Sequence, residues 1–255
     1  MTAMRLSPAT AAACAALLAL PATVRAEGVL NIFNWGDYTS PELIEKFEQK
    51  YDIKVTITDY DSNDTALAKV KAGGHGFDIV VPTSPFIPIW IRDGLLLESR
   101  PDQMENFKHV DPRWVDVSFD PGRHYTVPWQ WGTTGVVVNT DVYQGPADSW
   151  SIVFDPPPEL AGKLNIIPEM NDIINGAIMY VGGTPCTNDK AVLKKVRDLL
   201  TAAKPKWLSI NYASPETYSK GDVAGGANWN GYTFRARLQN PAVKFALPKE
   251  GFPIW

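Results

Sequence analysis

One short segment near the start of the chain carries side chains that together can bind an organic cation. Residues 34–38 read NWGDY and directly follow a β-rich run, VLNIF. The rings of Trp35 and Tyr38 present negative faces, and the Asp37 carboxylate between them adds a full negative charge. Two rings and an acid within one turn can therefore cage an ammonium group, and this composition favours binding over catalysis.

Two further acids stand three residues apart at the start of a predicted helix. Because residues i and i+3 share a helix face, we expect Glu169 and Asp172 to point the same way. The pair can hold a cation, serve as the two acids of a hydrolase, or only complement the positive end of the helix. Asp37 can likewise act only as a cap for the helix beginning near Pro41. Residue type alone leaves these alternatives open.

The first 26 residues are typical of a secretory signal peptide. Arg5 gives a positive start, residues 9–20 are apolar or small, and VRA precedes a plausible cleavage site at Glu27. The apolar run is too short to cross a membrane. The leader also contains Cys14, so the mature chain keeps only Cys186 and cannot form an internal disulfide. We therefore expect a soluble periplasmic protein.

The charge and the remaining motifs exclude several classes of partner. Removing Arg5 and Arg25 with the leader changes the net charge from -4 to -6, which disfavours nucleic acid and attracts cations. A calcium-loop-like start at residues 59–63 fails, because Asp64 and Val70 occupy the positions that need glycine and glutamate. The histidines are isolated from one another, so no zinc site is expected. We expect neither a metal nor a cofactor.

The elements that must position these residues alternate between strands and helices. The predicted order is strand 29–33, helix 41–50, strand 53–58, helix 62–72 and strand 77–82. Strands at this spacing with helices between them indicate parallel βαβ units, whose ligands bind beyond the carboxyl ends of the strands. The loops at residues 34–38 and 83–86 should therefore share one rim. Leu43, Ile44 and Phe47 form one apolar face of the first helix.

A second α/β set follows a less regular, proline-rich stretch at residues 101–128. Its predicted elements are strand 134–139, strand 163–168, helix 170–181, helix 190–203 and strand 243–248. Helix 190–203 is amphipathic, and its predicted inward residues are Val192, Leu193, Val196, Leu199 and Leu200. We expect the chain to cross between two domains near residues 128–134 and to return near Pro248. No internal repeat of short period is evident.

Five short motifs occur in order along the mature chain. They are NWGDY at 34–38, FDIVVP at 77–82, PWQWG at 128–132, WNG at 229–231 and PKEG at 248–251. Together they resemble the periplasmic polyamine-binding proteins, the spermidine/putrescine receptors of bacterial ABC importers. The resemblance implies the α/β periplasmic-binding-protein (venus-flytrap) fold, with two α/β lobes of mixed sheets joined by a crossover hinge. Residues 27–131 then begin lobe I, residues 132–248 form lobe II, and residues 249–255 return toward lobe I.

The resemblance also implies a ligand and a partner. A polyamine of the putrescine or spermidine class would be clamped between the lobes and delivered to permease subunits in the inner membrane. Because such a ligand joins cationic ends by an apolar spacer, it needs rings along its length and acids at its ends. The positions that carry over are Trp35, Gly36, Asp37, Tyr38, Thr83, Ser84, Glu169, Asp172, Trp229, Tyr232 and Trp255. The implied protein is a monomer that neither spans the membrane nor catalyses a reaction.

Three positions depart from the family pattern. Tyr232 stands where relatives carry serine or aspartate, Pro85 replaces a residue that is often aromatic or polar, and Asp172 replaces a longer glutamate. A receptor of the same fold for another solute, such as an amino acid or ferric ion, is one alternative, for which neither Arg92 nor Arg235 obviously supplies the expected arginine clamp. An exported hydrolase using Glu169 and Asp172 is the other, although no nucleophile motif supports it.

We also expect the sequence to be incomplete at its C-terminal end. Residues 251–255 stop in an apolar strand without a closing helix, which would leave a hydrophobic edge exposed. The resemblance implies that relatives continue beyond this point. They would add the rest of lobe I and a further cleft carboxylate just after Trp255.

Overall fold

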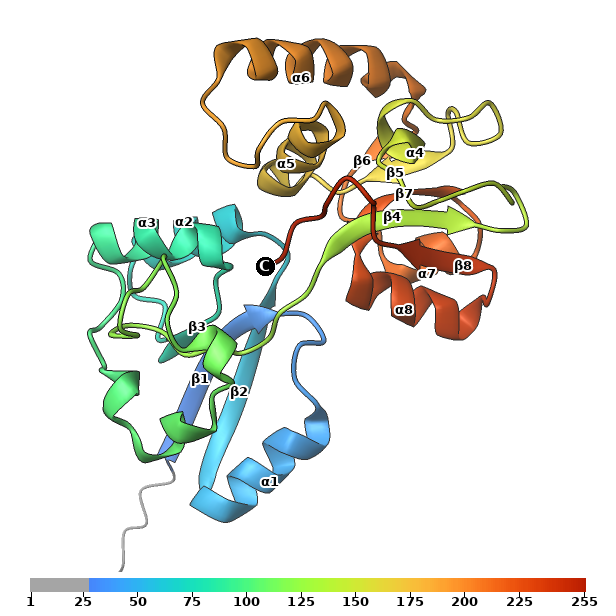
Figure 1. The fold of residues 1–255 in the computed structure, drawn as a ribbon. Coiled ribbons are helices and arrows are strands. Elements are labelled where there is room, and N and C mark those ends of the chain that lie inside the picture. Colours follow the sequence, from blue (N-terminus) through green and yellow to red (C-terminus); the bar gives the residue numbers. More distant parts are fainter. Residues whose placement is uncertain (1–27) are drawn as a thin grey trace, which may run out of the picture.

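The computed structural model describes residues 28–255, and its elements fall into two groups (Figure 1). The predicted signal peptide lies outside the described residues. The first group contains β1 (Gly28–Trp35), α1 (Pro41–Tyr51), β2 (Ile53–Tyr60), α2 (Asn63–Lys71), β3 (Ile79–Val80), α3 (Ile87–Arg92) and the 3₁₀ turns Ser84–Phe86, Pro101–Gln103, Glu105–His109 and Pro112–Trp114. The second contains β4 (Thr134–Asn139), α4 (Ser151–Phe154), β5 (Leu164–Ile166), α5 (Met170–Tyr180), α6 (Lys190–Ala203), the 3₁₀ turn Lys204–Lys206, β6 (Ser209–Ile210), α7 (Pro215–Ser219), β7 (Gly225–Trp229), α8 (Asn230–Gln239) and β8 (Val243–Ala246).

The first group is built on a parallel sheet of order β2-β1-β3. Strand β1 pairs with β2 along its whole length, from Gly28 opposite Ile53 to Trp35 opposite Tyr60. The predicted parallel βαβ arrangement is confirmed, and the loops after β1 and β3 do leave the same edge of the sheet. Strand β3 is shorter than the predicted 77–82, because only Ile79 and Val80 pair with β1.

Helix α1 begins where the sequence predicts but buries none of its residues. Pro41 occupies the first turn, and the helix ends at Tyr51 and is followed by Asp52, whose φ of 54° is left-handed. The apolar face does not become core, since Leu43 is 59% exposed. The prediction that Leu193 of α6 faces inward is also wrong. This side chain lies at the surface, while Val196 of the same helix is buried.

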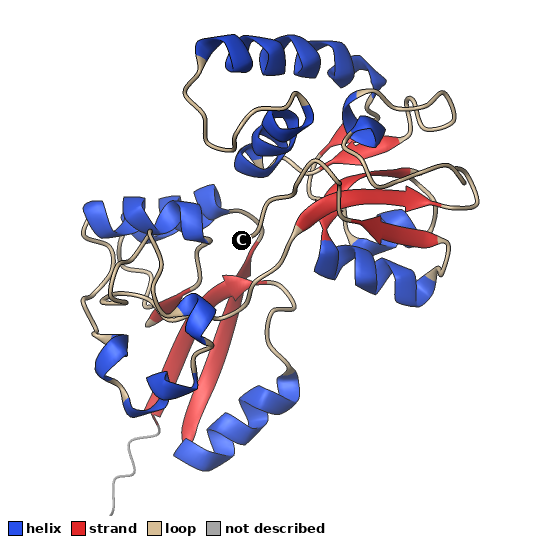
Figure 2. Ribbon diagram, in the orientation of Figure 1, coloured by secondary structure: helices blue, strands red, loops and turns tan. Residues whose placement is uncertain are grey.

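The second group is built on a mixed sheet of order β6-β5-β7-β4-β8. Strand β5 runs parallel to β6 and β7, whereas β4 runs antiparallel to both β7 and β8. All of β4 is buried, and helices lie on both sides of the sheet (Figure 2). The fold is therefore the expected α/β periplasmic-binding-protein fold with two lobes. Helix α8, which starts directly after β7, was not predicted.

Two chain segments pass between the groups side by side (Figure 1). The Gly132 amide donates to the Trp255 carbonyl at 2.9 Å, and the Trp255 amide donates back at 3.1 Å. Thr133 and Ile254 continue this antiparallel contact. A side chain at Gly132 would overlap the Trp255 ring, so the glycine allows that ring to reach the space between the lobes. Among the described residues, no helix combines the length and apolarity needed to cross a bilayer.

Candidate ligand-binding site

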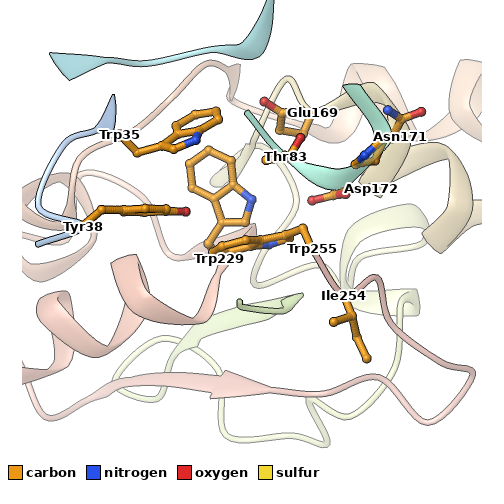
Figure 3. Close-up of a pocket in the computed structure, with 10 residues that line it drawn as sticks. Trp35, Tyr38, Thr83, Glu169, Asn171, Asp172, Trp229, Ile254 and Trp255 are labelled. Carbon is orange, nitrogen blue, oxygen red and sulfur yellow. The ribbon is translucent and has the colours of Figure 1, made fainter. Parts of the chain in front are cut away.

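A cavity of about 420 Å³, counted to its open mouth, lies between the two lobes at the rim that the sequence predicts (Figure 3). We call it the inner cavity. Side chains from both lobes and from the C-terminal segment line it, namely Trp35, Tyr38, Thr83, Pro85, Glu169, Asn171, Asp172, Trp229, Ile254 and Trp255. Seven of these were predicted as site residues. Pro85, Asn171 and Ile254 were not.

Trp35 is fixed at the end of β1 by its backbone and by its ring. The side-chain oxygen of the fully buried Asn34 accepts the Trp35 amide at 2.8 Å. The indole N–H donates to the Val81 carbonyl at 2.9 Å, which ties the ring to the loop after β3. The ring centroid lies 4.7 Å from that of Tyr60 and 6.1 Å from that of Tyr38. Trp35 is thus a rigid platform on one wall of the cavity.

Trp229 occupies the equivalent place at the end of β7 and contacts most of the other rings. The buried Asn228 accepts the Trp229 amide at 2.7 Å, as Asn34 does for Trp35. The Trp229 ring lies edge-on to Trp35 at 5.9 Å and to Trp255 at 6.2 Å. It stacks on Tyr212 with 5.8 Å between centroids and an interplanar angle of 23°. Trp229 therefore joins the rings of both lobes into one aromatic wall.

Glu169 and Asp172 supply the negative charge of the inner cavity. The Tyr212 hydroxyl donates to Glu169 at 2.8 Å, and the Thr134 hydroxyl donates to Asp172. Burial raises the pKa of Asp172, and the Thr134 and Trp229 side chains act in the opposite direction. Burial also raises the pKa of Glu169, partly offset by Tyr212. Both carboxylates are thus partly buried, and they accept hydrogen bonds from neutral donors.

The arrangement of rings and acids suits a ligand with an ammonium end and an apolar body. Trp35, Tyr38 and Trp229 gather on one side, and the carboxylates of Glu169 and Asp172 lie on the other (Figure 3). A cation placed between these acids would relieve the unfavourable burial of their charge. Methylene groups would then contact the ring faces.

Asp37 and Tyr232 face a different space from the other predicted residues. They line a second, more open cavity, the outer cavity, together with Asp61, Tyr212 and Arg235. The Arg235 side chain donates to Asp37, and its guanidinium lies 4.6 Å from the centroid of the Tyr232 ring. Arg235 was not predicted as a site residue, yet it contacts two residues that were, Asp37 and Tyr232.

Two predicted residues lie outside both cavities, and one residue of the site was not predicted. Gly36 and Ser84 line neither the inner nor the outer cavity. Tyr212 was missed because no local motif surrounds it, although it contacts both Glu169 and the Trp229 ring. Among residues 28–255, no cluster of three or more histidine, cysteine, aspartate or glutamate side chains could hold a metal ion.

A pattern that does appear in the sequence was also missed. Residues 34–39 read NWGDYT and residues 228–233 read NWNGYT, so asparagine, tryptophan, tyrosine and threonine recur at the same spacing. Each segment closes a strand that ends at the rim and leads into a helix. This recurrence would have pointed to Asn34 and Asn228 as the residues that hold the two tryptophans.

Known proteins resemble this chain in sequence and in fold. The family model described as bacterial extracellular solute-binding protein matches residues 42–255. The chain belongs to this family. It is 30% identical over 238 residues to the spermidine/putrescine-binding periplasmic protein 1 of Haemophilus influenzae, a match that covers 92% of this chain and 66% of that protein. The chain thus spans slightly less than two thirds of that relative's length.

A further relative and two solved structures agree with this placement. A putrescine/cadaverine-binding protein of Pseudomonas aeruginosa is 30% identical over 250 residues, covering 93% of this chain and 70% of that protein. Among solved structures, the spermidine/putrescine ABC transporter substrate-binding protein PotD of Streptococcus pneumoniae aligns with a TM-score of 0.76 and 25% identity, covering 89% of this chain and 70% of that one. The TpPotD lipoprotein of Treponema pallidum aligns with a TM-score of 0.78 and 26% identity, covering 89% and 73%.

Proposed function

We propose that this protein is the periplasmic solute-binding component of a bacterial ABC importer and that it binds a polyamine of the putrescine or spermidine class. One structural observation gives this function its strongest support. Two half-buried acids, Glu169 and Asp172, face a wall of aromatic rings contributed by both lobes. The names of the relatives from Haemophilus and Pseudomonas point to the same ligand class.

The chemistry of the inner cavity explains why a polyamine fits it. An ammonium group between Glu169 and Asp172 receives two charged acceptors, and it compensates carboxylates that burial otherwise penalises. The alkyl chain then runs along the faces of Trp35 and Trp229, where it displaces water from apolar surface. Neither a sugar nor a simple amino acid needs two uncompensated acids beside an aromatic wall.

Both lobes contribute residues to the proposed binding site. We assign residues 27–131 to the first part of lobe I, residues 132–248 to lobe II and residues 249–255 to the return strand. The platform of Trp35 then belongs to lobe I, while Glu169, Asp172 and Trp229 belong to lobe II, so a bound ligand links the lobes. The closed monomer would be presented to the permease subunits, and Glu169 and Asp172 bind the ligand without catalysing its conversion.

A calorimetric titration tests this function. Putrescine, cadaverine and spermidine should bind the chain, whereas glycine, arginine and fructose should give no comparable heat. The double variant Glu169→Gln, Asp172→Asn should lose roughly 10- to 150-fold in diamine affinity, the range expected when hydrogen bonds to charged groups are removed. Glu159→Gln, at an exposed position outside both cavities, is the matched control and should bind as the unmodified chain does. Preferential binding of an amino acid or a sugar contradicts the proposal.

A further inference from the structure

The inner and outer cavities lie against the same aromatic wall but differ in their charges. Tyr212 donates to Glu169 of the inner cavity and itself lines the outer one. The rings of Trp229 and Tyr232, one from each cavity, lie 5.4 Å apart. A ligand that extends past this wall from the inner cavity would reach the outer one.

Tyr38 shows that the charges of the two cavities lie close together. Burial is the main cause that raises the pKa of Tyr38, followed by Tyr232. Arg235 lowers this pKa and Glu169 raises it, so the hydroxyl lies within electrostatic range of both. Tyr38, which lines the inner cavity, therefore lies close enough to Arg235 of the outer cavity to be affected by its charge.

Arg235 already occupies the kind of cation cage that the sequence predicts around Asp37. Its guanidinium bonds the Asp37 carboxylate and lies over the Tyr232 ring, so a carboxylate and an aromatic face surround one positive charge. The two partners are 198 residues apart in sequence and belong to opposite lobes. The cation in this cage is thus supplied by the protein itself.

Among the residues that the structure describes, none supplies a comparable cation to the inner cavity. The Tyr212 hydroxyl donates to Glu169 and the Thr134 hydroxyl donates to Asp172, and neither acid takes part in an ion pair between described residues. Glu169 and Asp172 therefore have no cationic partner among the described residues, whereas Asp37 at the other end of the site is already paired with Arg235.

We propose that Arg235 is a specificity-determining residue, because it acts as the resident cation of Asp37 and must be displaced by the second positive charge of a ligand. This rests on the proposed function, in which the first ammonium binds between Glu169 and Asp172. A ligand with an uncharged far end leaves the Arg235–Asp37 pair intact, whereas a diamine competes with it. Asp37 is 78% exposed and Arg235 32% exposed, so the pair is weak and shifts preference without excluding diamines.

Amines of equal length that differ only in their second charge test this role. Butylamine and putrescine share a four-carbon chain, so the ratio of their affinities isolates the far ammonium. In Arg235→Gln this ratio should move two- to fivefold toward putrescine, the range of one exposed ion pair. Arg235→Lys should restore the ratio of the unmodified chain, since it keeps the positive charge. Arg237→Gln, at an exposed position two residues further along α8, is the matched control and should leave the ratio unchanged.

The outcomes separate this proposal from the function on which it rests. An unchanged ratio in Arg235→Gln, with a native circular dichroism spectrum, overturns the role of Arg235 and leaves polyamine binding intact. A ratio that moves equally in Arg237→Gln also overturns it, because a general loss of positive charge would then be the cause. If the unmodified chain binds no amine at all, both proposals fall.

Discussion

The two segments NWGDYT and NWNGYT place similar rings on opposite lobes but end in different charges. In both, a buried asparagine accepts the amide of the following tryptophan, at 2.8 Å for Trp35 and 2.7 Å for Trp229. Both tryptophans are buried, and their rings meet edge-on at 5.9 Å. The shared residues therefore build the same platform twice.

The difference begins directly after the tryptophan. In the first segment a loop separates β1 from α1, and Asp37 sits in it at a left-handed φ of 60° with an exposed carboxylate. In the second, β7 runs straight into α8, and Gly231 takes the place of the acid. Arg235 follows one helical turn later. One lobe thus contributes an acid at this position, whereas the other contributes a base one helical turn further on.

The polar edges of the two tryptophan rings also differ. The Trp35 indole N–H is bonded to the backbone carbonyl of Val81, whereas the Trp229 side chain acts on Asp172 and lowers its pKa. Trp35 is thus anchored to its own lobe, and Trp229 is coupled to the charge of the cavity. We therefore expect the two tryptophans to contribute unequally to binding a cation.

Replacing each tryptophan by phenylalanine should show the largest difference between the two lobes. Trp229→Phe removes a donor to a charged acid and should weaken putrescine binding by roughly 1.5 kcal/mol, about tenfold. Trp35→Phe should cost roughly 1 kcal/mol less, because the Val81 carbonyl still accepts from the Tyr60 hydroxyl. Calorimetric titration of both folded variants measures the difference. Equal losses would show that only ring area matters and would remove the distinction drawn here.

The buried acids of lobe II should behave differently from the exposed acid of lobe I. Because burial raises the pKa values of Glu169 and Asp172, the folded protein binds protons more readily than the unfolded chain does, so their ionised forms destabilise the ligand-free fold. Asp172→Asn should therefore raise the ligand-free Tm at neutral pH by roughly 2–4 °C, or ~1 kcal/mol. Asp37→Asn, at an exposed position, should not raise it.

The pH dependence follows from the same shifts. The Tm advantage of Asp172→Asn should disappear as the pH falls through the raised pKa, because the aspartate then becomes neutral as well. Polyamine affinity of the unmodified chain should fall over the same range, which lies above the ordinary values of 3.8 and 4.5 for the two acids. Thermal scans and titrations across this range check both statements. A constant Tm gap at every pH would show that charge burial is not its cause.

The parts of this structure that sequence predicts are those with a local signal. Strand β4 and helix α6 begin and end where the sequence pattern places them, because strong periodicity and clear breakers surround both. Trp229 could be named because it lies in a motif that matches the family, and Glu169 because it stands three residues before Asp172 at a predicted helix start and matches a family position. The local pattern of α1 was equally clear, yet none of its apolar residues is fully buried and Leu43 is exposed, because burial depends on which other element packs against the helix.

What could not be predicted depends on contacts between distant residues. Arg235 lies 198 positions from Asp37, and nothing near either residue indicates the pair. Tyr212 reaches Glu169 from a segment 43 residues away that carries no motif. The aromatic wall between the cavities forms only when both lobes pack against the C-terminal segment. The charges on its two sides could therefore not be assigned from sequence.

Giving the second segment the acid that it lacks should produce the smallest effect and the most specific one. A side chain at Gly231 meets no atom within 4 Å, so Gly231→Asp fits without repacking. The introduced carboxylate lies in the first turn of α8, where it is favoured by the helix dipole, and four residues before Arg235. The free energy of unfolding should therefore rise by about 0.5 kcal/mol. Arg235 should also turn toward the new acid and release Asp37.

The released Asp37 should then favour a second ammonium, so the putrescine-to-butylamine affinity ratio should rise in Gly231→Asp by roughly twofold, the effect of one weak exposed pair. Gly231→Asn is the matched control, since it has the same size without the charge and cannot pair with Arg235. Titrations of both variants, with chemical unfolding to follow stability, separate charge from shape. A similar ratio in the two variants would mean that Arg235 stays with Asp37, and that the difference between the two segments is set by the β1–α1 loop and not by the acid.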